Sequence, residues 1–326
     1  MRFVLVAGAT ETAGIEGISA AGANRAAMVH TPSADAEILV YGAPVSSSLV
    51  PVSPAGCPTP AVVTRAVRES VGFPVTVLDA GLARPTAAPT VALAGPPGGD
   101  VRDPVPVPNA TEVFETARTL GERLPEDRIV IGETIPGGTT TAMGVLAALG
   151  EREVVSSSLA ENPLSLKREV VEGGLAASDL ERGECAGDPI RAVERMGDPV
   201  LAGVVGLAVG ALDSGTVVTL GGGTQMVAAA ALVRHAGIET PLSLSTTSFV
   251  AADVDLDPVV ESLDVSLSVT DPEFATANHE SMGRYTRGEA KEGVGMGGAL
   301  AEYAGSGGSF PELHDRIVTV YDRLFR

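Results

Sequence analysis

The sequence contains almost no lysine. Of its 22 basic residues only Lys167 and Lys291 are lysine, and the others are arginine. They stand against 41 acidic residues, which gives a formal net charge of −19. Binding to nucleic acid requires a basic patch that neutralises phosphates, and the chain has no cluster of Lys or Arg. Surplus carboxylates beside abundant Ala and Gly indicate adaptation to a salty cytoplasm, so the charge reflects the solvent and not the substrate.

Cysteine and long apolar runs are also scarce. Cys57 and Cys185 are too few and too far apart for a disulfide framework or a thiolate metal site. The four histidines show no metal-ligand spacing, and we expect neither a metal nor a cofactor. The most apolar run, residues 199–212, is shorter than the roughly twenty residues that span a membrane, and residues 2–7 are too short for a signal sequence. We therefore expect a cytoplasmic protein that does not contact membranes.

A strand, a glycine turn and an alanine-rich helix follow one another in the middle of the chain. Residues 128–131 form the predicted strand, with Glu133 at its carboxyl end, and Gly137 and Gly138 form the turn. The helix then begins at Thr139 and Thr140, where we expect a threonine hydroxyl to cap it. Free N–H groups at a helix start favour anions, which points to a phosphorylated substrate. An ordinary strand-to-helix loop is the competing interpretation.

The same order of elements recurs later in the chain. Residues 216–220 are strand-like, Gly222 and Gly223 lie in the turn, and Thr224 begins an alanine-rich helix. Two such units in one parallel sheet aim their turns at the same carboxyl edge, where α/β sheets bind ligands. Alternating strands and helices predict an α/β fold with a doubly wound, mostly parallel sheet flanked by helices. We also expect strands at residues 2–7, 37–42 and 73–79, and a long loop over residues 84–109 that acts as a lid.

Two further charged residues lie in unusual surroundings. Glu292 precedes a run of glycines that includes Gly293 and Gly295, and a helix follows. Shielding from water in such a turn raises the pKa of a carboxyl group and suits it to act as a base; a surface glutamate is the alternative. Lys167 lies in the first turn of a helix that starts after Pro163, which is unfavourable for a cation unless an anion is near. A solvated lysine is the alternative here.

Several stretches together resemble a known family. In order, they are Cys57-Pro58-Thr59-Pro60, Val77-Leu78-Asp79-Ala80-Gly81, Gly132-Glu133 with Gly137-Gly138-Thr139-Thr140, Lys167-Arg168-Glu169, Asp188-Pro189-Ile190 and Lys291-Glu292-Gly293-Val294-Gly295. Over roughly residues 55–300 the chain is similar to the nicotinate-nucleotide:dimethylbenzimidazole phosphoribosyltransferases of cobamide assembly, most closely to their archaeal branch.

The resemblance implies an activity and a set of roles. Nicotinate mononucleotide gives its phosphoribosyl group to a benzimidazole-type azole base, and nicotinate is released. Glu292 is then the general base, Glu133 stabilises charge on the ribose or shares the proton, and Lys167 holds the phosphate together with the two helix starts. The resemblance also implies a homodimer. Residues 1–326 are expected to form a single unit, with a core of about residues 35–285 and a smaller subdomain from residues 1–34 and 286–326.

Two regions depart from the bacterial branch of that family. Tyr41-Gly42-Ala43-Pro44 stands where that branch has Asp-His-Gly, and Gly221-Gly222-Gly223-Thr224-Gln225 stands where it has Asp-Gly-Phe. Both regions are expected near the incoming base, so the identity of the acceptor stays open. One rival function is a catalytically silent protein that binds a nucleotide or cobamide. The other is a nicotinamide-dependent oxidoreductase, although the chain lacks the Gly-x-Gly-x-x-Gly fingerprint.

Overall fold

The chain folds around one parallel sheet, seen in a computed structural model that describes residues 1–19, 21, 24–46 and 49–325. In this part of the chain the sheet has seven strands in the order β3-β2-β1-β4-β5-β6-β7, and each neighbouring pair is parallel. The strands are β1 (Arg2–Ala7), β2 (Val75–Asp79), β3 (Thr90–Ala92), β4 (Arg128–Thr134), β5 (Val217–Gly221), β6 (Leu242–Thr247) and β7 (Val265–Thr270).

The strand order reverses between β1 and β4. From β1 the chain builds outward through β2 to β3, and it then returns to the other side of β1 to build β4 to β7. The register sets Val6 beside Glu133 and Ala7 beside Thr134. The carboxyl ends of two strands where the order reverses leave a crevice that binds ligands in open α/β sheets.

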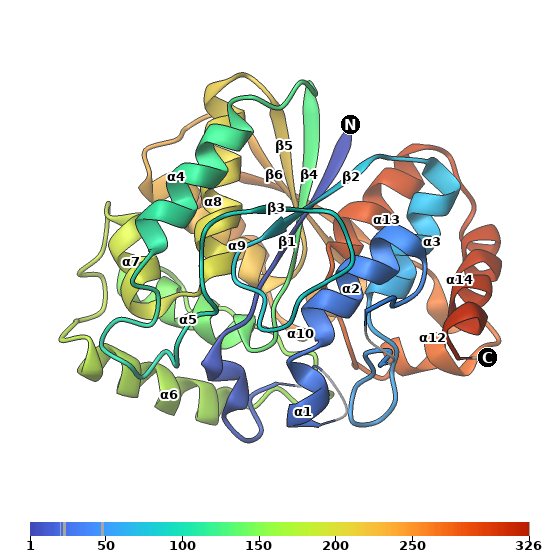
Figure 1. The fold of residues 1–326 in the computed structure, drawn as a ribbon, viewed down its shortest axis with the longest axis horizontal. Coiled ribbons are helices and arrows are strands. Elements are labelled where there is room, and N and C mark those ends of the chain that lie inside the picture. The colour runs from blue at the N-terminus through green and yellow to red at the C-terminus, as the bar shows by residue number, and fades with distance from the viewer. Residues whose placement is uncertain (20, 22–23, 47–48, 326) are drawn as a thin grey trace.

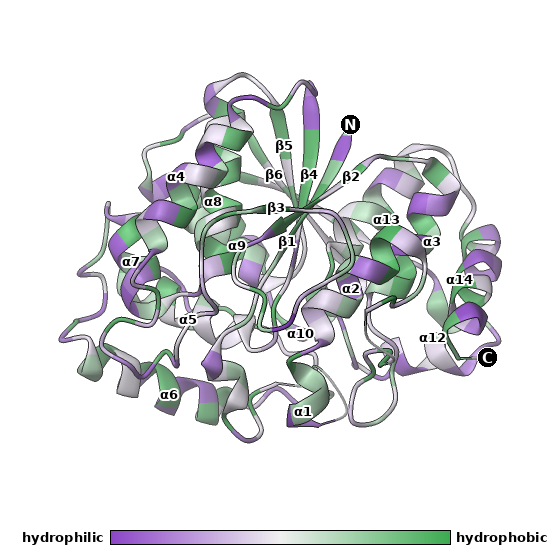
Figure 2. Ribbon diagram, viewed as in Figure 1, coloured by the Kyte–Doolittle hydropathy of each residue, from purple (hydrophilic) through white to green (hydrophobic). Residues whose placement is uncertain are grey.

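Helices cover both faces of the sheet, as Figure 1 shows. A hydrophobic core lies on each face, and the strands β4 and β5 are hydrophobic over much of their length (Figure 2), as parallel strands buried on both faces are. One face carries α4 (Ala110–Gly121), α5 (Gly138–Leu149), α6 (Leu164–Ala177), α7 (Pro189–Met196), α8 (Pro199–Asp213) and α9 (Thr224–His235). The other carries α2 (Thr31–Tyr41), α3 (Ala61–Val71), α13 (Met296–Gly305) and α14 (Phe310–Phe325). The predicted α/β fold with a doubly wound sheet is confirmed.

Short helices complete the fold. They are the 3-10 turns η1 (Glu11–Gly14) and η2 (Phe274–Thr276), with α1 (Arg25–Met28), α10 (Ser248–Asp253), α11 (Asp257–Ser262) and α12 (Glu280–Tyr285). Among the described residues, no helix is both long and apolar enough to cross a membrane.

The predicted strand at residues 37–42 is wrong. Residues 37–41 form the second half of α2, which begins at Thr31 and has Pro32 in its first turn. A short apolar run has no periodicity that separates a strand from a buried helix. Proline at the start of a helix is favourable, and this feature gives the correct boundary.

The long loop at residues 84–109 contains the short strand β3 and then packs on the segment after β1. Backbone bonds join Gly98 to Ala9 and to Glu11, and the hydroxyl of Thr12 accepts a bond of 2.9 Å from the N–H of Val101. Within the described chain no residue of this loop lines the pocket described below. The predicted lid is therefore a structural loop in this conformation.

The terminal segments contribute to the sheet and its cover. β1, near the start of the chain, is a central strand of the sheet. At the other end of the chain, α13 packs on β4, β5, β6 and β7. The division into a core and a terminal subdomain stays a prediction.

Candidate active site

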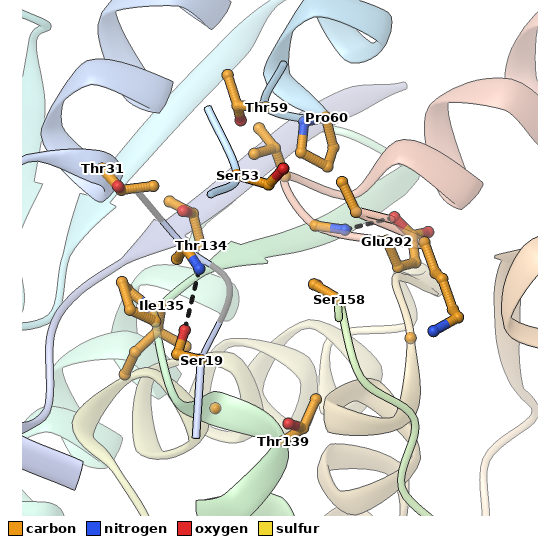
Figure 3. Close-up of a pocket in the computed structure, with 18 of the residues that line it drawn as sticks. Ser19, Thr31, Ser53, Thr59, Pro60, Thr134, Ile135, Thr139, Ser158 and Glu292 are labelled. Atoms are coloured by element: carbon orange, nitrogen blue, oxygen red, sulfur yellow. Dashed lines mark hydrogen bonds between the residues drawn. The ribbon is translucent and has the colours of Figure 1, made fainter. Parts of the chain in front are cut away.

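A pocket opens at the carboxyl edge of the sheet beside the end of β4. Its lining comes from segments far apart in the sequence, among them residues 133–139, 156–158, 223–225 and 290–294. Figure 3 shows side chains from several of these segments facing one another. The space between them amounts to about 990 Å³, the part open to solvent included.

Glu133 lies at the end of β4, and its side chain faces the pocket while being almost fully buried. Burial raises the pKa of Glu133 to about 8, and repulsion from Glu292, Asp198 and Asp35 adds to the shift. The carbonyl oxygen of Glu133 accepts a bond of 2.8 Å from the N–H of Val294. This bond fastens the segment that carries Glu292 to the end of β4.

Glu292 lies just before α13 and also lines the pocket. Its carboxylate accepts a bond of 2.7 Å from the N–H of Gly293 and a second bond from the N–H of Gly297. A Cβ added at Gly297 would lie 2.5 Å from both Glu292 Oε1 and Thr246 Cα, so only glycine lets this N–H reach the carboxylate. Burial raises the pKa of Glu292 to about 8, although bonds from backbone N–H groups oppose the shift.

Two helix starts open into the same pocket. α5 begins after Gly137, whose φ of 82° is in the left-handed region that favours glycine. A side chain at Gly138 would collide with Gln225, which lies at the start of α9. A Cβ at Gly223 would lie only 3.3 Å from Cβ of Glu292, so the start of α9 lies beside the second carboxylate. The amino-terminal ends of two helices, which favour anions, therefore lie near the two acids.

Lys167 lies behind the pocket wall and not in its lining. Its side chain is fully buried, and its ammonium group donates bonds of 2.9 Å to Thr139 Oγ1 and 2.7 Å to the carbonyl of Ser156. Burial lowers the pKa of Lys167 to about 7, with Asp253 opposing this shift and Lys291 adding to it.

The predicted threonine cap of α5 is wrong, since no side chain caps this helix.

Lys291 holds the neighbouring part of the same wall. Its ammonium group donates bonds of 2.7 Å to the carbonyls of Ser157 and Leu159 and lies 3.6 Å from a carboxylate oxygen of Asp253. Both lysines of the sequence thus fix one short segment, Ser156–Leu159, which we call the serine strap. Three residues of the strap line the pocket.

The other predicted site residues divide into two groups. Within the described residues, the pocket lining includes Gly137, Gly138, Thr139, Gly223, Thr224 and Gly293, and it leaves out Thr140, Gly222 and Gly295. These three shape the turns around the pocket: Thr140 donates its N–H to the carbonyl of Gly137, and Gly222 donates to Ser245. Gly295 packs on the backbone of β4, where a Cβ would lie 2.9 Å from Cα of Gly132.

A family model described as phosphoribosyltransferase matches residues 63–240. The chain belongs to this phosphoribosyltransferase family. A UPF0284 protein of Halobacterium salinarum is 59% identical to it over 99% of this chain and 98% of that protein. A UPF0284 protein of Archaeoglobus fulgidus is 41% identical, over 99% of this chain and 93% of its own length. The family predicted from the motifs is confirmed, and the halobacterial relative agrees with the predicted adaptation to salt.

Solved structures share the fold of this phosphoribosyltransferase. The crystal structure of CobT from Thermus thermophilus superposes with a TM-score of 0.62 over 98% of this chain and 83% of that chain, at 19% identity. A structure of the nicotinate-nucleotide-dimethylbenzimidazole phosphoribosyltransferase of the same organism gives a TM-score of 0.60 at 20% identity, over 98% and 82% of the two chains. These matches establish the fold, and the family model describes a phosphoribosyltransferase and not an oxidoreductase.

The phosphoribosyltransferase site also contains residues that the sequence did not reveal. Asp35, Thr31 and Ser53 line the pocket, but they lie in segments without a motif, and the first two are on a helix whose second half was predicted as a strand. Thr59 and Lys291 also line it. Both occur inside stretches that resemble the family, and the rarity of lysine is a signal that singles out Lys291.

Several carboxylates line the pocket, among them Asp35, Glu133 and Glu292. In the parts of the chain that the structure describes, no group of three or more His, Cys, Asp or Glu side chains is placed to hold a metal ion. The carboxylates are instead held by hydroxyl and N–H donors, as the bonds to Asp35 and Glu292 show.

Proposed function

We propose that the enzyme transfers the phosphoribosyl group of nicotinate mononucleotide to a benzimidazole-type base. The products would be nicotinate and an α-ribazole-5'-phosphate-like nucleotide for the lower ligand of cobamides. The observation that carries this proposal is that Glu133, Glu292 and the first residues of α5 and α9 line one pocket. By resemblance to the family we propose that the enzyme acts as a homodimer, and from the features of its sequence that it is cytoplasmic.

The two helix starts suit the donor phosphate. Their N–H groups favour an anion, and the small residues at 137–139 and 223 leave the backbone open to it. Lys167 supports this end indirectly, because its bond to Thr139 orients that hydroxyl and its bond to Ser156 fixes the serine strap. In this proposal Lys167 contributes positive charge from behind the wall and does not touch the phosphate.

The leaving group needs little help. The glycosidic nitrogen of nicotinate mononucleotide is already cationic, so when the N–C1′ bond breaks its electron pair neutralises the ring and nicotinate departs without a general acid. The incoming azole attacks C1′ from the opposite face and inverts it. The azole must lose its N–H proton in this step, because the nitrogen that bonds to C1′ otherwise becomes cationic.

Glu292 is the base that accepts this proton. It is held by Gly293 and Gly297, and its raised pKa makes it a strong enough base for an azole N–H. Glu133 lies close enough to Glu292 for the charge of Glu292 to raise its pKa, and in its ionised form it stabilises the positive charge that develops on the ribose.

Replacement of Glu292 tests the proposal directly. A general base contributes on the order of 10²- to 10⁴-fold, so Glu292→Gln should lower kcat by about this factor while the Kd for nicotinate mononucleotide changes little. Nicotinate release and the mass of the nucleotide product are the measurements. Glu312→Gln, an exposed glutamate on α14, is the matched control and should leave kcat unchanged.

Two outcomes would contradict this assignment. Unchanged kcat in Glu292→Gln removes Glu292 from the mechanism. Tight binding of the mononucleotide by the wild-type protein without nicotinate release, over a panel of azoles and purines, would instead support the silent binding protein.

A further inference from the structure

One end of the pocket is formed by a helix face and two neighbouring turns. Thr31 and Asp35 are one helical turn apart in α2 and therefore lie on the same face. Thr59, which precedes α3, and Thr134, which follows Glu133 in β4, complete this end, and all four residues line the pocket. Figure 3 shows Thr31, Thr59 and Thr134 on the side of the pocket away from Thr139 and Ser158. We call these four residues the distal end.

Asp35 is held in place but keeps free acceptor capacity. Thr59 Oγ1 donates a bond of 2.6 Å to one carboxylate oxygen, and Thr134 Oγ1 donates a bond of 2.7 Å to the other. A carboxylate has roughly four acceptor positions, so each oxygen has room for one more donor. The residue is 2% exposed, which leaves little contact with solvent to supply that donor.

Thr31 provides an independent observation at the same place. Its hydroxyl is buried, with 7% of the residue exposed, and none of the described residues forms a hydrogen bond with it. A buried hydroxyl without a partner is unfavourable, and native proteins rarely leave one. Since Thr31 lines the pocket, a bound molecule is placed to pair with it.

With the substrates placed as in the proposed function, the distal end lies on the acceptor side of the reacting groups. Glu133 is adjacent in sequence to Thr134, and its pKa is raised by burial and by the charges of Glu292 and Asp35, so it lies within electrostatic range of both. With the donor phosphate at the starts of α5 and α9, the ribose lies beside the two glutamates. An azole that attacks C1′ then directs the ring edge opposite its nitrogens toward Asp35 and Thr31.

We propose that Thr31 and Asp35 select an acceptor base that carries a hydrogen-bond donor, a hydroxyl or amino group, on this far edge. The inference rests on the proposed function and narrows its substrate class. The donor's proton bonds to the free position of Asp35, and the hydroxyl of Thr31 pairs with the same substituent. A base with only methyl groups there leaves both polar side chains without partners.

Three benzimidazoles of similar size test the selection. The 5-hydroxy compound carries a donor, the 5-methoxy compound offers only an acceptor, and the 5-methyl compound offers neither. Sites built to bind a hydroxyl discriminate strongly against analogues that lack it, so kcat/KM for 5-hydroxybenzimidazole should exceed the value for 5-methylbenzimidazole by about tenfold or more. The value of kcat/KM for the 5-methoxy compound should be close to the value for the 5-methyl compound. Nicotinate release with nicotinate mononucleotide as donor is the assay.

Variants assign the preference to the distal end. Thr31→Val removes the hydroxyl at constant shape and should reduce the hydroxy-to-methyl ratio of kcat/KM about tenfold. Thr31→Ser keeps the hydroxyl and should retain the ratio, which separates recognition from a packing defect. Thr111→Val, on the exposed side of α4, is the matched control and should leave the ratio unchanged.

The outcomes distinguish this inference from the proposed function. Equal or better turnover of the 5-methyl compound by the wild-type enzyme overturns the selection, while the nicotinate released preserves the function. A ratio unchanged by Thr31→Val overturns the role of Thr31. If no base at all releases nicotinate, the proposed function fails and the inference fails with it.

Discussion

At the scale of single residues, the site depends on two acids that burial keeps protonated near neutrality. Burial raises the pKa values of Glu133 and Glu292 to about 8, and the charge of Glu292 adds to the shift of Glu133. An acid whose pKa is higher in the folded than in the unfolded chain favours folding below its unfolded pKa, and this stability is lost as the pH rises through the folded value. The base form needed for catalysis therefore costs stability.

The pH profile of the reaction follows from these values. Because Glu292 must lose its proton to act as a base, kcat/KM should rise about tenfold per pH unit below a pH of about 8 and level off above it. Glu133→Gln removes a neighbouring charge, so the midpoint should move to lower pH. Nicotinate release measured across this range is the test, and a flat profile for the wild-type enzyme would contradict it.

Residues of the candidate site could be predicted from the sequence where they stand in a recognisable motif. Glu133 and Glu292 stand beside glycine turns, and the structure brings both into one pocket. Thr31 and Asp35 were missed, because their role depends on the face that α2 turns toward the pocket and on donors from β4 and the segment before α3. Lys167 was predicted to hold the phosphate, but it lies behind the pocket lining, and this position depends on how α6 packs on α5.

At the scale of elements, Asp198 joins three helices around the phosphate end. Its carboxylate caps α8 by accepting a bond from the N–H of Leu201. It also accepts a bond of 2.5 Å from the hydroxyl of Thr141 in α5 and one of 3.1 Å from the side-chain amide of Gln225 in α9. The residue is fully buried. One side chain thus fixes the relative positions of the two helix starts that we assign to the phosphate.

Loss of this connection should affect both folding and binding. Asp198→Ala should lower the free energy of unfolding by about 2–4 kcal/mol, because it removes a cap and leaves buried donors unpaired, and it should raise KM for nicotinate mononucleotide. Asp188→Ala is the control: Asp188 is an exposed residue that caps only α7, so about 1 kcal/mol and no change in KM are expected. Urea unfolding and initial rates measure the two effects. If Asp198→Ala and Asp188→Ala lowered the free energy of unfolding equally and neither changed KM, Asp198 would not be what holds the three helices together.

Some helices were predicted from the sequence, whereas some strands were not. Helices that begin after a glycine turn or a proline were found, as α5, α6 and α9 show. The strands β6 and β7 were missed because serine and threonine alternate with their apolar residues, a pattern that also occurs in loops.

At the scale of the whole molecule, net charge sets the response to salt. A formal net charge of −19 makes the folded surface repel itself. The Debye length falls from about 10 Å at 0.1 M to about 3 Å at 1 M, so added salt screens this repulsion.

KCl should therefore raise the Tm of the protein. We expect a continuous increase between about 0.1 M and 1 M at neutral pH, where Debye screening changes most. The same titration near the isoelectric point of 4.5 is the control, since the net repulsion is absent there and the increase should be much smaller. Differential scanning calorimetry measures both series, and a Tm at neutral pH that does not change with KCl would contradict the prediction.

Because both lysines are buried, the folded chain should react little with reagents that modify lysine side chains. Lys167 is fully enclosed, and Lys291 is 4% exposed with its ammonium group held by the serine strap and paired with Asp253. Acylating labels, amine cross-linkers and enzymes that modify lysine tails thus find no accessible side-chain target on the native molecule. Such reagents therefore leave the two lysines that hold the pocket wall unmodified.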